Sequence, residues 1–198
     1  MRTDVIICGV GGQGILSIAT VIGRAVLKAG LQLKQSEVHG MAQRGGAVQT
    51  HFRISDGPIF SDLVPQGGAG IIISMEPLEA LRYLNWLAAD GWLIANRTPV
   101  VNIRNYPPVE EIYKQIKLIP KSLLFDATEL ATSLGSPRSI NMALLGAAAP
   151  FLPVSGELLE EAVAGQFASK GEKVVSDNIR IFRAARELGL KASHDAQP

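Results

Sequence analysis

Residues 4–14, DVIICGVGGQG, decide how the rest of the chain folds. An apolar run over residues 5–10 stops at a cluster of glycines, and an apolar-periodic segment follows over residues 15–29. This order predicts a strand, a tight glycine turn and a helix. Glycine suits such a turn because it reaches backbone angles closed to other residues and lets a bound group approach the main chain. The first N–H groups and the positive dipole end of the helix then favour an anion.

Composition limits the classes of protein that the chain can be. An apolar fraction of 47% in 198 residues is enough for one domain with a substantial core. Its 19 basic and 18 acidic residues nearly cancel, so neither nucleic acid nor a membrane surface is an expected partner. No window approaches the roughly 20 apolar residues of a membrane span, and the N-terminus lacks a signal-peptide pattern. We expect a cytoplasmic single domain over residues 1–198, with a disordered tail at about residues 190–198.

The chain contains a single cysteine, Cys8, which lies inside the first predicted strand. One cysteine excludes a disulfide framework within the chain. It also excludes an iron–sulfur cluster held by this chain alone, since such clusters normally take about four cysteines. We therefore expect Cys8 to be buried apolar filler rather than a nucleophile.

Periodicity and turn residues predict the remaining elements. Strands are expected over residues 31–38, 47–54, 70–75, 92–95 and 122–125, and helices over residues 77–88, 109–117, 128–134, 140–149, 155–168 and 172–188. The dipeptide Asp56-Gly57 is typical of a hairpin, so residues 47–54 should pair antiparallel with residues 59–61 and keep one face partly wet. Ser155 is expected to cap its helix and Gly189 to end the last helix. The pattern favours an α/β fold, a Rossmann-like, doubly wound and mostly parallel sheet with an inserted antiparallel hairpin, in three layers.

Candidate site residues follow the predicted strands. Ligands of doubly wound sheets bind beyond the carboxyl ends of the strands, where the strand order reverses. These ends carry the glycine turn with Gly11, Gly12, Gln13 and Gly14, the loop at residues 38–46, and Glu76, Asn96 and Asp126. We expect all of them to share one surface.

The glycine turn also suggests dinucleotide binding, because Gly9, Gly11 and Gly14 match GxGxxG between a strand and a helix. That chemistry needs an acidic residue about 20 residues later to hold a ribose hydroxyl. Glu37 lies slightly further along than that and is a marginal fit. A free-standing NAD- or FAD-binding oxidoreductase therefore remains an open alternative.

A second group of candidates lies in the loop HGMAQRGG, which contains His39, Gln43, Arg44, Gly45 and Gly46. A guanidinium beside two glycines can clamp an anion with two parallel hydrogen bonds, and a histidine can exchange a proton near neutral pH. An equally open interpretation is that the arginine only caps the sheet and the histidine is simply hydrogen-bonded. The histidines lack ligand spacing with cysteine or paired carboxylates, so no metal site is expected. No catalytic triad or acid pair is recognisable, so no catalytic residue is expected in this chain.

In four segments the chain resembles the small subunit of indolepyruvate:ferredoxin oxidoreductase, a relative of the gamma subunit or domain of pyruvate and other 2-oxoacid:ferredoxin oxidoreductases. The segments follow the same order along nearly the whole chain. They are residues 4–17 (DVIICGVGGQGILS), 36–55 (SEVHGMAQRGGAVQTHFRIS), 75–82 (MEPLEALR) and 141–147 (NMALLGA).

The resemblance implies a subunit that is inactive alone, within an enzyme that oxidatively decarboxylates 2-oxoacids such as arylpyruvates to acyl-CoA, carbon dioxide and reduced ferredoxin. It implies that thiamine diphosphate and the iron–sulfur clusters belong to a large, cysteine-rich partner subunit, through which ferredoxin is reached, and that this chain holds neither. Coenzyme A is then a co-substrate at a site which this chain shares. A structural adaptor that only stabilises a larger partner is a further alternative.

The residues that we assign to such a shared site lie in the glycine turn, in the HGMAQRGG loop, after a strand and at a helix start. They are Gly11, Gly12, Gln13, Gly14, His39, Gln43, Arg44, Gly45, Gly46, Glu76 and Asn141. The resemblance leaves open which loop contacts coenzyme A and which contacts the partner subunit.

Overall fold

The computed structural model describes residues 1–39 and 45–196, and six of its strands form one sheet in the order β2-β3-β1-β4-β5-β6. The strands are β1 (Arg2–Val10), β2 (Gln32–His39), β3 (Ala47–Ser55), β4 (Ala69–Ser74), β5 (Leu87–Asn96) and β6 (Ser122–Phe125). The β1–β4, β4–β5 and β5–β6 pairs are parallel, whereas β3 runs antiparallel to both of its neighbours, β1 and β2. The expected mostly parallel, Rossmann-like sheet is confirmed.

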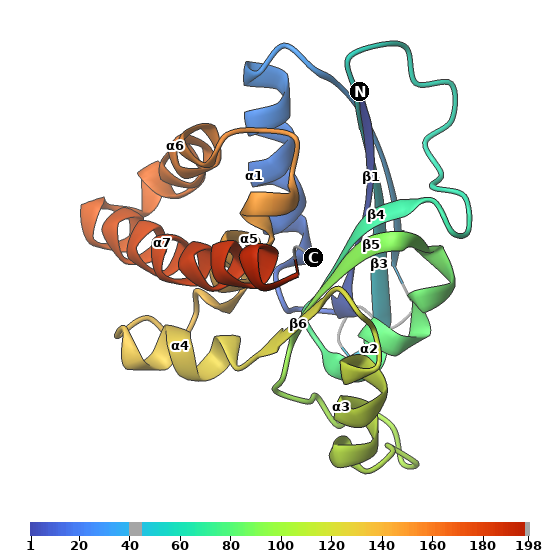
Figure 1. The fold of residues 1–198 in the computed structure, drawn as a ribbon. Coiled ribbons are helices and arrows are strands. Elements are labelled where there is room, and N and C mark those ends of the chain that lie inside the picture. The colour runs from blue at the N-terminus through green and yellow to red at the C-terminus, as the bar shows by residue number, and fades with distance from the viewer. Residues whose placement is uncertain (40–44, 197–198) are drawn as a thin grey trace.

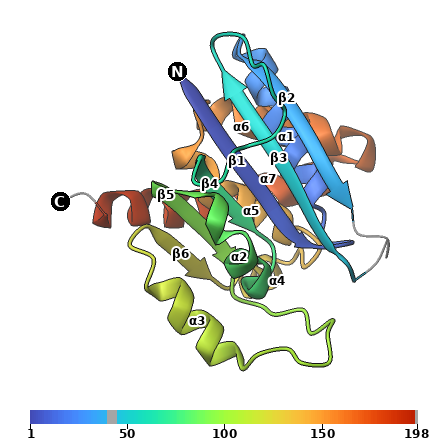
Figure 2. The same cartoon turned by 90° about the vertical axis from the view of Figure 1, so that its right-hand side faces the viewer.

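The antiparallel hairpin consists of β2 and β3, so the predicted pairing of β3 with residues 59–61 is wrong. Strand β3 pairs with β1 from Arg2↔Ser55 to Val10↔Ala47, and with β2 along its other edge. Because both edges of β3 are occupied, no edge remains for a strand after Asp56. Residues 59–61 carry no strand, and the chain instead passes over the sheet toward β4 (Figure 2).

Helices cover both faces of the sheet in three layers (Figure 1). One face carries α1 (Ile15–Lys28), α4 (Ala127–Ser133), α5 (Ile140–Ala148), α6 (Gly156–Phe167) and α7 (Glu172–Asp195), and the other carries α2 (Pro77–Arg82) and α3 (Val109–Lys117). Short 3-10 helices are η1 (Leu84–Trp86), η2 (Ala149–Phe151) and η3 (Ala168–Lys170). None of the helices in the described ranges has the length and apolar character needed to cross a membrane.

The central strands are apolar on both sides, which is why the sheet can be covered twice. Ile7 and Ile73 belong to the core beneath α1 and α5, whereas Ile6 and Ile72 belong to the core beneath α2 and α3. All four side chains are fully or almost fully buried. Alternate residues of one strand therefore anchor different helical layers.

Two helix ends differ from the sequence expectation. Helix α2 stops at Arg82 rather than near residue 88, because β5 already begins at Leu87, which pairs with Ala69. Helix α7 continues to Asp195, so the expected disorder of residues 190–195 is wrong, and residues 197–198 lie outside the described residues. The predicted cap of α6 is confirmed, since the Ser155 hydroxyl accepts a hydrogen bond from the Leu158 N–H.

Gly189 lies inside α7 instead of ending it, for a packing reason. A Cβ at Gly189 would overlap the Ala147 carbonyl oxygen of α5, and a Cβ at Gly146 of α5 would overlap the Phe182 carbonyl oxygen of α7. The two glycines thus allow the backbones of α5 and α7 to pass in direct contact. A glycine that permits close helix packing looks the same in sequence as one that ends a helix.

The face of β3 that was expected to be partly wet is largely buried. Arg53 is 5% exposed, forms an ion pair with Asp4 and donates to the carbonyl oxygens of Ser61 and Leu63. His51 is also buried. The expectation failed because residues 61–65 cover this side of the sheet, which the alternating pattern of β3 could not reveal.

Burial gives His51 a pH-dependent role in stability. Its Nδ1 accepts a hydrogen bond of 3.1 Å from the Val64 N–H, an arrangement that requires this nitrogen to be unprotonated. Burial lowers the pKa of His51 from its ordinary value of 6.5, although the nearby Asp62 opposes the shift. The unfolded chain therefore binds a proton at a higher pH than the folded chain does.

His51→Asn, which keeps an acceptor near Nδ1, should reduce the pH dependence of stability. As the pH falls below about 6.5, the wild-type free energy of unfolding should decrease, because only the unfolded state takes up this proton. Denaturant unfolding at several pH values should show a shallower decrease in the variant than in the wild type. If the free energies of unfolding of wild type and variant differed by the same amount from neutral to acidic pH, this role would be contradicted.

Candidate functional site

The glycine turn joins β1 to α1 at the carboxyl edge of the sheet. Gly12 and Gly14 have positive φ angles of 99° and 85°, a conformation that side-chain-bearing residues rarely adopt. Between them, the Gln13 side chain accepts from the Val10 N–H at 2.7 Å and donates to the Met75 carbonyl oxygen at 3.2 Å. Gln13 therefore closes the turn on itself and ties it to the end of β4.

Within residues 1–39 and 45–196, no side chain caps the N-terminus of α1. Among the described residues, no oxygen accepts from the backbone N–H groups of Gly12, Gly14, Ile15 or Leu16, and the first turn of α1 carries no acidic residue. By contrast, α2, α4 and α6 are each capped by a side chain of their own N-cap residue. The uncapped donors and the helix dipole together make this end of α1 suited to an anion.

A small pocket lies against this turn. Its volume is about 300 Å³, and it is lined by residues 10–16 together with Val48 of β3. Val48 is adjacent because β1 and β3 pair there, Gly9 opposite Val48. The pocket therefore combines backbone donors with an apolar wall.

The second candidate loop meets the glycine turn, although its central part lies outside the described residues. The Gly11 N–H donates to the Gly46 carbonyl oxygen at 2.8 Å, and the backbone of His39 pairs with Val48 at the end of β2. Gln43 and Arg44 lie outside the described residues, so their predicted roles stay predictions. The loop nevertheless begins and ends at the edge that carries the glycine turn.

Strand order argues against a dinucleotide site of the usual kind. In the nucleotide-binding version of this fold, β2 lies directly beside β1 and its acidic residue reaches the ribose. Here β3 lies between β1 and β2, which moves Glu37 of β2 two strand spacings, roughly 10 Å, from β1. Glu37 is therefore poorly placed to act with the glycine turn on one nucleotide.

Polar side chains at the ends of β4 and β5 hold the local backbone together. The Met75 carbonyl oxygen accepts from the amides of both Gln13 and Asn96. The Asn96 amide oxygen accepts from the N–H groups of Thr98 and Ala127. These side chains bring the ends of β4 and β5 into register with the glycine turn.

Glu76 is 1% exposed, and both of its carboxylate oxygens have partners within the chain. One accepts from the Glu79 N–H at the start of α2, and the other accepts from the Val100 N–H and the Tyr106 hydroxyl. Burial, followed by this hydrogen bond to Glu76, raises the pKa of Tyr106. The geometry gives Glu76 a positioning role, and its predicted contact with a ligand stays a prediction.

Residues 97–108 form a part of this surface that sequence reasoning missed. Asn102 donates from its amide to the Gly45 carbonyl oxygen at 2.7 Å, which joins this segment to the HGMAQRGG loop. Thr98 donates to Asp126, the N-cap residue of α4. Val101 and Ile103, on either side of Asn102, remain 70% and 44% exposed and form an apolar tip on a hydrogen-bonded segment. No periodic pattern marks these residues, so only the fold places them beside the turn.

Asn141 braces the turn from the other helical layer. It lies in the first turn of α5, and its amide donates weakly, at 3.5 Å, to the Gly14 carbonyl oxygen. A Cβ at Gly14 would stand 2.8 Å from the Asn141 Nδ2 atom. Asn141 therefore lies against the glycine turn, and its predicted contact with a ligand stays a prediction.

Cys8 behaves as the sequence predicts. It is fully buried in β1, and burial raises the pKa of its thiol to about 12, so it stays protonated at neutral pH. Within the described ranges, no group of three or more histidine, cysteine, aspartate or glutamate residues could hold a metal ion. We derive no metal chemistry from these side chains.

Gly14→Ala and Gly12→Ala form a matched pair that tests the turn. Both substitutions force alanine into a positive φ, at a cost of about 1–2 kcal/mol. Only Gly14→Ala also meets a neighbour, the Asn141 amide, whereas nothing lies within 4 Å of a Cβ at Gly12. Gly14→Ala should therefore lower the free energy of unfolding by about 1 kcal/mol more than Gly12→Ala, measured by denaturant titration.

The double variant Gly14→Ala/Asn141→Ala serves as the control. If the excess loss comes from the crowded amide, Asn141→Ala should cost less in the Gly14→Ala background than in the wild type. Equal losses for the two glycine variants, or fully additive losses in the double variant, would contradict this account.

Comparisons with known proteins agree with the fold and with one enzyme class. Residues 4–188 match the family described as pyruvate ferredoxin/flavodoxin oxidoreductase. The chain is 38% identical, over 202 aligned positions covering 97% of it and 96% of its relative, to an indolepyruvate oxidoreductase subunit of Pyrococcus horikoshii.

Two solved structures have a similar fold. One is the gamma subunit of a keto/oxoacid ferredoxin oxidoreductase from Geobacter sulfurreducens, with a TM-score of 0.71 and 26% identity, covering 97% of this chain and 98% of that one. The other is a 2-oxoglutarate:ferredoxin oxidoreductase from Magnetococcus marinus with 2-oxoglutarate, coenzyme A and succinyl-CoA bound, with a TM-score of 0.76 and 20% identity. It matches 96% of this chain over 31% of that chain, and at this identity the likeness concerns the fold alone.

Proposed function

Because the chain belongs to the pyruvate ferredoxin/flavodoxin oxidoreductase family, we propose that it is the small subunit of a cytoplasmic 2-oxoacid:ferredoxin oxidoreductase that acts on arylpyruvates such as indolepyruvate. The complex would oxidatively decarboxylate the 2-oxoacid and release acyl-CoA, carbon dioxide and reduced ferredoxin. Thiamine diphosphate and the iron–sulfur clusters would lie on a large, cysteine-rich subunit. Thiamine diphosphate would supply the decarboxylation chemistry, and this chain would supply part of the walls of the site.

One observation carries this proposal, the meeting of three segments at the carboxyl edge of the sheet. The glycine turn, the ends of the HGMAQRGG loop and residues 97–108 are joined there by the Gly11–Gly46 and Asn102–Gly45 hydrogen bonds. Exposed apolar side chains surround them, namely Leu16, Val38, Val101 and Ile103. An apolar rim around unpaired backbone donors suits an edge that a partner subunit covers while an anionic group binds within.

Within this edge, the proposed task of the chain is to bind and orient an anionic group. The N–H groups at the start of α1 have the geometry for a phosphate of coenzyme A or a substrate carboxylate. Arg44, in the adjoining loop, is proposed as a bidentate clamp on the same group. Gln13, Glu76 and Asn141 then act as positioning residues, because each holds backbone of the turn or of its neighbours.

Two alternatives from other classes predict different behaviour. A free-standing NAD- or FAD-binding oxidoreductase should bind its nucleotide as an isolated chain, and the place of Glu37 beyond β3 disfavours it. A structural adaptor should stabilise a large subunit but leave its catalytic rate unaffected by substitutions at the carboxyl edge. Both alternatives can be tested together with the proposal.

The purified chain should be colourless and should not turn over arylpyruvates, since nothing in it is proposed to hold thiamine diphosphate or a cluster. Turnover with coenzyme A and ferredoxin should appear on reconstitution with the large subunit. The measurements are an absorption spectrum and the rate of ferredoxin reduction with and without the partner. Turnover by the chain alone, or tight NAD or FAD binding, would refute the assignment.

Arg44→Lys should separate a clamp from a structural arginine. Lysine keeps the charge but loses the rigid two-pronged geometry, so coenzyme A binding or subunit association should weaken about tenfold while the Tm stays nearly unchanged. Arg24→Lys is a suitable control, because Arg24 is exposed on α1. A lower Tm with unaltered affinity would instead mean that Arg44 is tied to its own sheet.

A further inference from the structure

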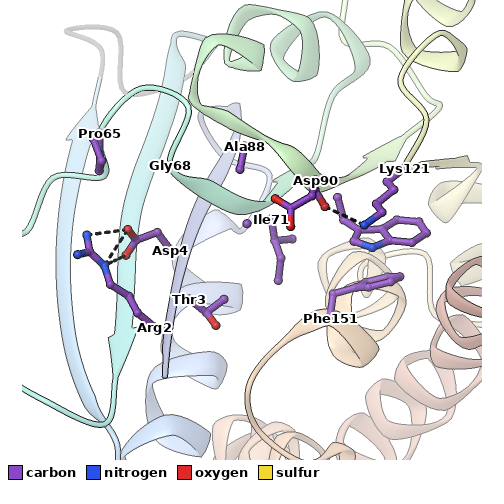
Figure 3. Close-up of a pocket in the computed structure, with 12 residues that line it drawn as sticks. Arg2, Thr3, Asp4, Pro65, Gly68, Ile71, Ala88, Asp90, Lys121 and Phe151 are labelled. Atoms are coloured by element: carbon purple, nitrogen blue, oxygen red, sulfur yellow. Dashed lines mark hydrogen bonds and ion pairs between the residues drawn. The ribbon is translucent and has the colours of Figure 1, made fainter. Parts of the chain in front are cut away.

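A second cavity, of about 740 Å³, lies at the edge of the sheet opposite to the glycine turn (Figure 3). Thr3 and Asp4 line it, and they lie at the start of β1, whereas the glycine turn follows the end of the same strand. The rest of the lining comes from Arg2, from Pro65 and Gly68 in the segment before β4, from β4 and β5, from the residue before β6 and from η2. We call it the amino-edge groove, and it is separate from the site proposed above.

An irregularity in the sheet opens this groove. Between β4 and β5 the register shifts, so that Ala69 pairs with Leu87 but Ile71 already pairs with Trp92. The intervening part of β5, which includes Asp90, has no partner on β4 and forms a rim of the groove. The shift in strand pairing therefore contributes to the shape of the groove.

One end of the groove has an aromatic wall. Trp92 of β5 and Phe151 of η2 stack with ring centroids 4.1 Å apart and an interplanar angle of 27°. Both rings line the groove, and both are only partly buried. A stacked pair of this kind offers a rigid apolar surface to a planar ring.

A lysine stands beside that wall. Lys121 is held next to Trp92, because the Leu93 N–H donates to the Lys121 backbone carbonyl oxygen at 2.9 Å. The Lys121 ammonium donates to the Asp90 backbone carbonyl oxygen at 3.2 Å, and no carboxylate in the described part of the chain forms an ion pair with it. Figure 3 shows Lys121, Asp90 and Phe151 together at this end. The ammonium thus keeps hydrogen-bonding capacity for a ligand anion.

At the opposite end of the groove, the charged side chains already have partners within the chain. The buried Asp4 carboxylate accepts from Arg2 and from Arg53, at 2.9 Å in each ion pair. The single Asp4 carboxylate balances one of the two guanidinium charges, and both guanidinium groups are hydrogen-bonded to it. The cation at the aromatic end of the groove is Lys121, and the exposed carboxylate beside it is Asp90.

We propose that the amino-edge groove binds a small aromatic carboxylate, with its ring against Trp92 and Phe151 and its carboxylate on Lys121. Two sources share this chemistry, an aryl acid without an amine and an aromatic amino acid. Asp90 distinguishes them, since its carboxylate can accept from an ammonium group but repels a second anion. The inference concerns a different edge of the sheet, and only its test in the reconstituted complex rests on the proposed function.

The test uses calorimetric titration of the full-length chain, alone and reconstituted with its partner, at about 0.15 M salt. The probes are indole-3-acetate, L-tryptophan and, as a ligand without carboxylate, indole. At least one of the two carboxylates should bind saturably and more tightly than indole. Lys121→Gln should weaken that binding about tenfold, whereas Lys117→Gln, an exposed control on α3, should leave it unchanged.

Further variants distinguish an aryl acid from an aromatic amino acid as the ligand, and other outcomes would refute the proposal. Phe151→Leu should weaken binding several-fold through the lost ring stacking. If tryptophan is the better ligand, Asp90→Asn should weaken it selectively, and if indole-3-acetate is better, Asp90→Asn should strengthen it. The proposal is overturned if neither carboxylate binds, if indole binds equally well, if both lysine variants behave alike, or if binding disappears in the reconstituted complex.

Discussion

The pairing of β1 on both edges is the constraint on which the rest of the structure depends. On one side β1 is hydrogen-bonded antiparallel to β3 over its whole length, and on the other it is parallel to β4. Its alternate side chains anchor both helical layers, and its end leads into the glycine turn. Because the strand is buried from Asp4 onward and paired along both edges, it determines where the turn leaves the sheet.

Polar residues at the carboxyl edge act on the backbone more than on a ligand. Gln13 and Asn96 both donate to the Met75 carbonyl oxygen, and Glu76 uses both oxygens on partners within the chain. Buried polar groups must find such partners, since an unpaired one costs about 1–3 kcal/mol. Among the described residues, no group accepts from the backbone N–H groups at the start of α1. The turn that exposes these N–H groups depends on a backbone conformation that glycine permits.

The helical layer on the α1 side depends on close packing of helix backbones. Gly146 and Gly189 stand where α5 and α7 touch, and any side chain at either position would meet a carbonyl oxygen of the other helix. This contact holds α7 against α5, whose first turn places Asn141 beside Gly14. The contact between α5 and α7 therefore helps to position Asn141 beside the glycine turn, although Gly189 lies far from that turn in the sequence.

The sequence by itself determined the local elements and the character of the turn. The boundaries of α3 and β6 and the start of α1 follow from periodicity, turn residues and charge, all of which act over a few neighbouring residues. The glycine cluster likewise indicated a tight turn before a helix. These features were predictable because a strand or helix of this kind is selected by its own side chains.

Only the tertiary structure decided which strands are neighbours and which polar residues are covered. The place of β3 between β1 and β2, the burial of His51 and Arg53 beneath residues 61–65, and the proximity of Asn102 to Gly45 all join distant parts of the chain. Alternation tells which residues share a face but not what covers that face. A pairing partner is chosen by the packing of the whole sheet, so no local pattern contains it.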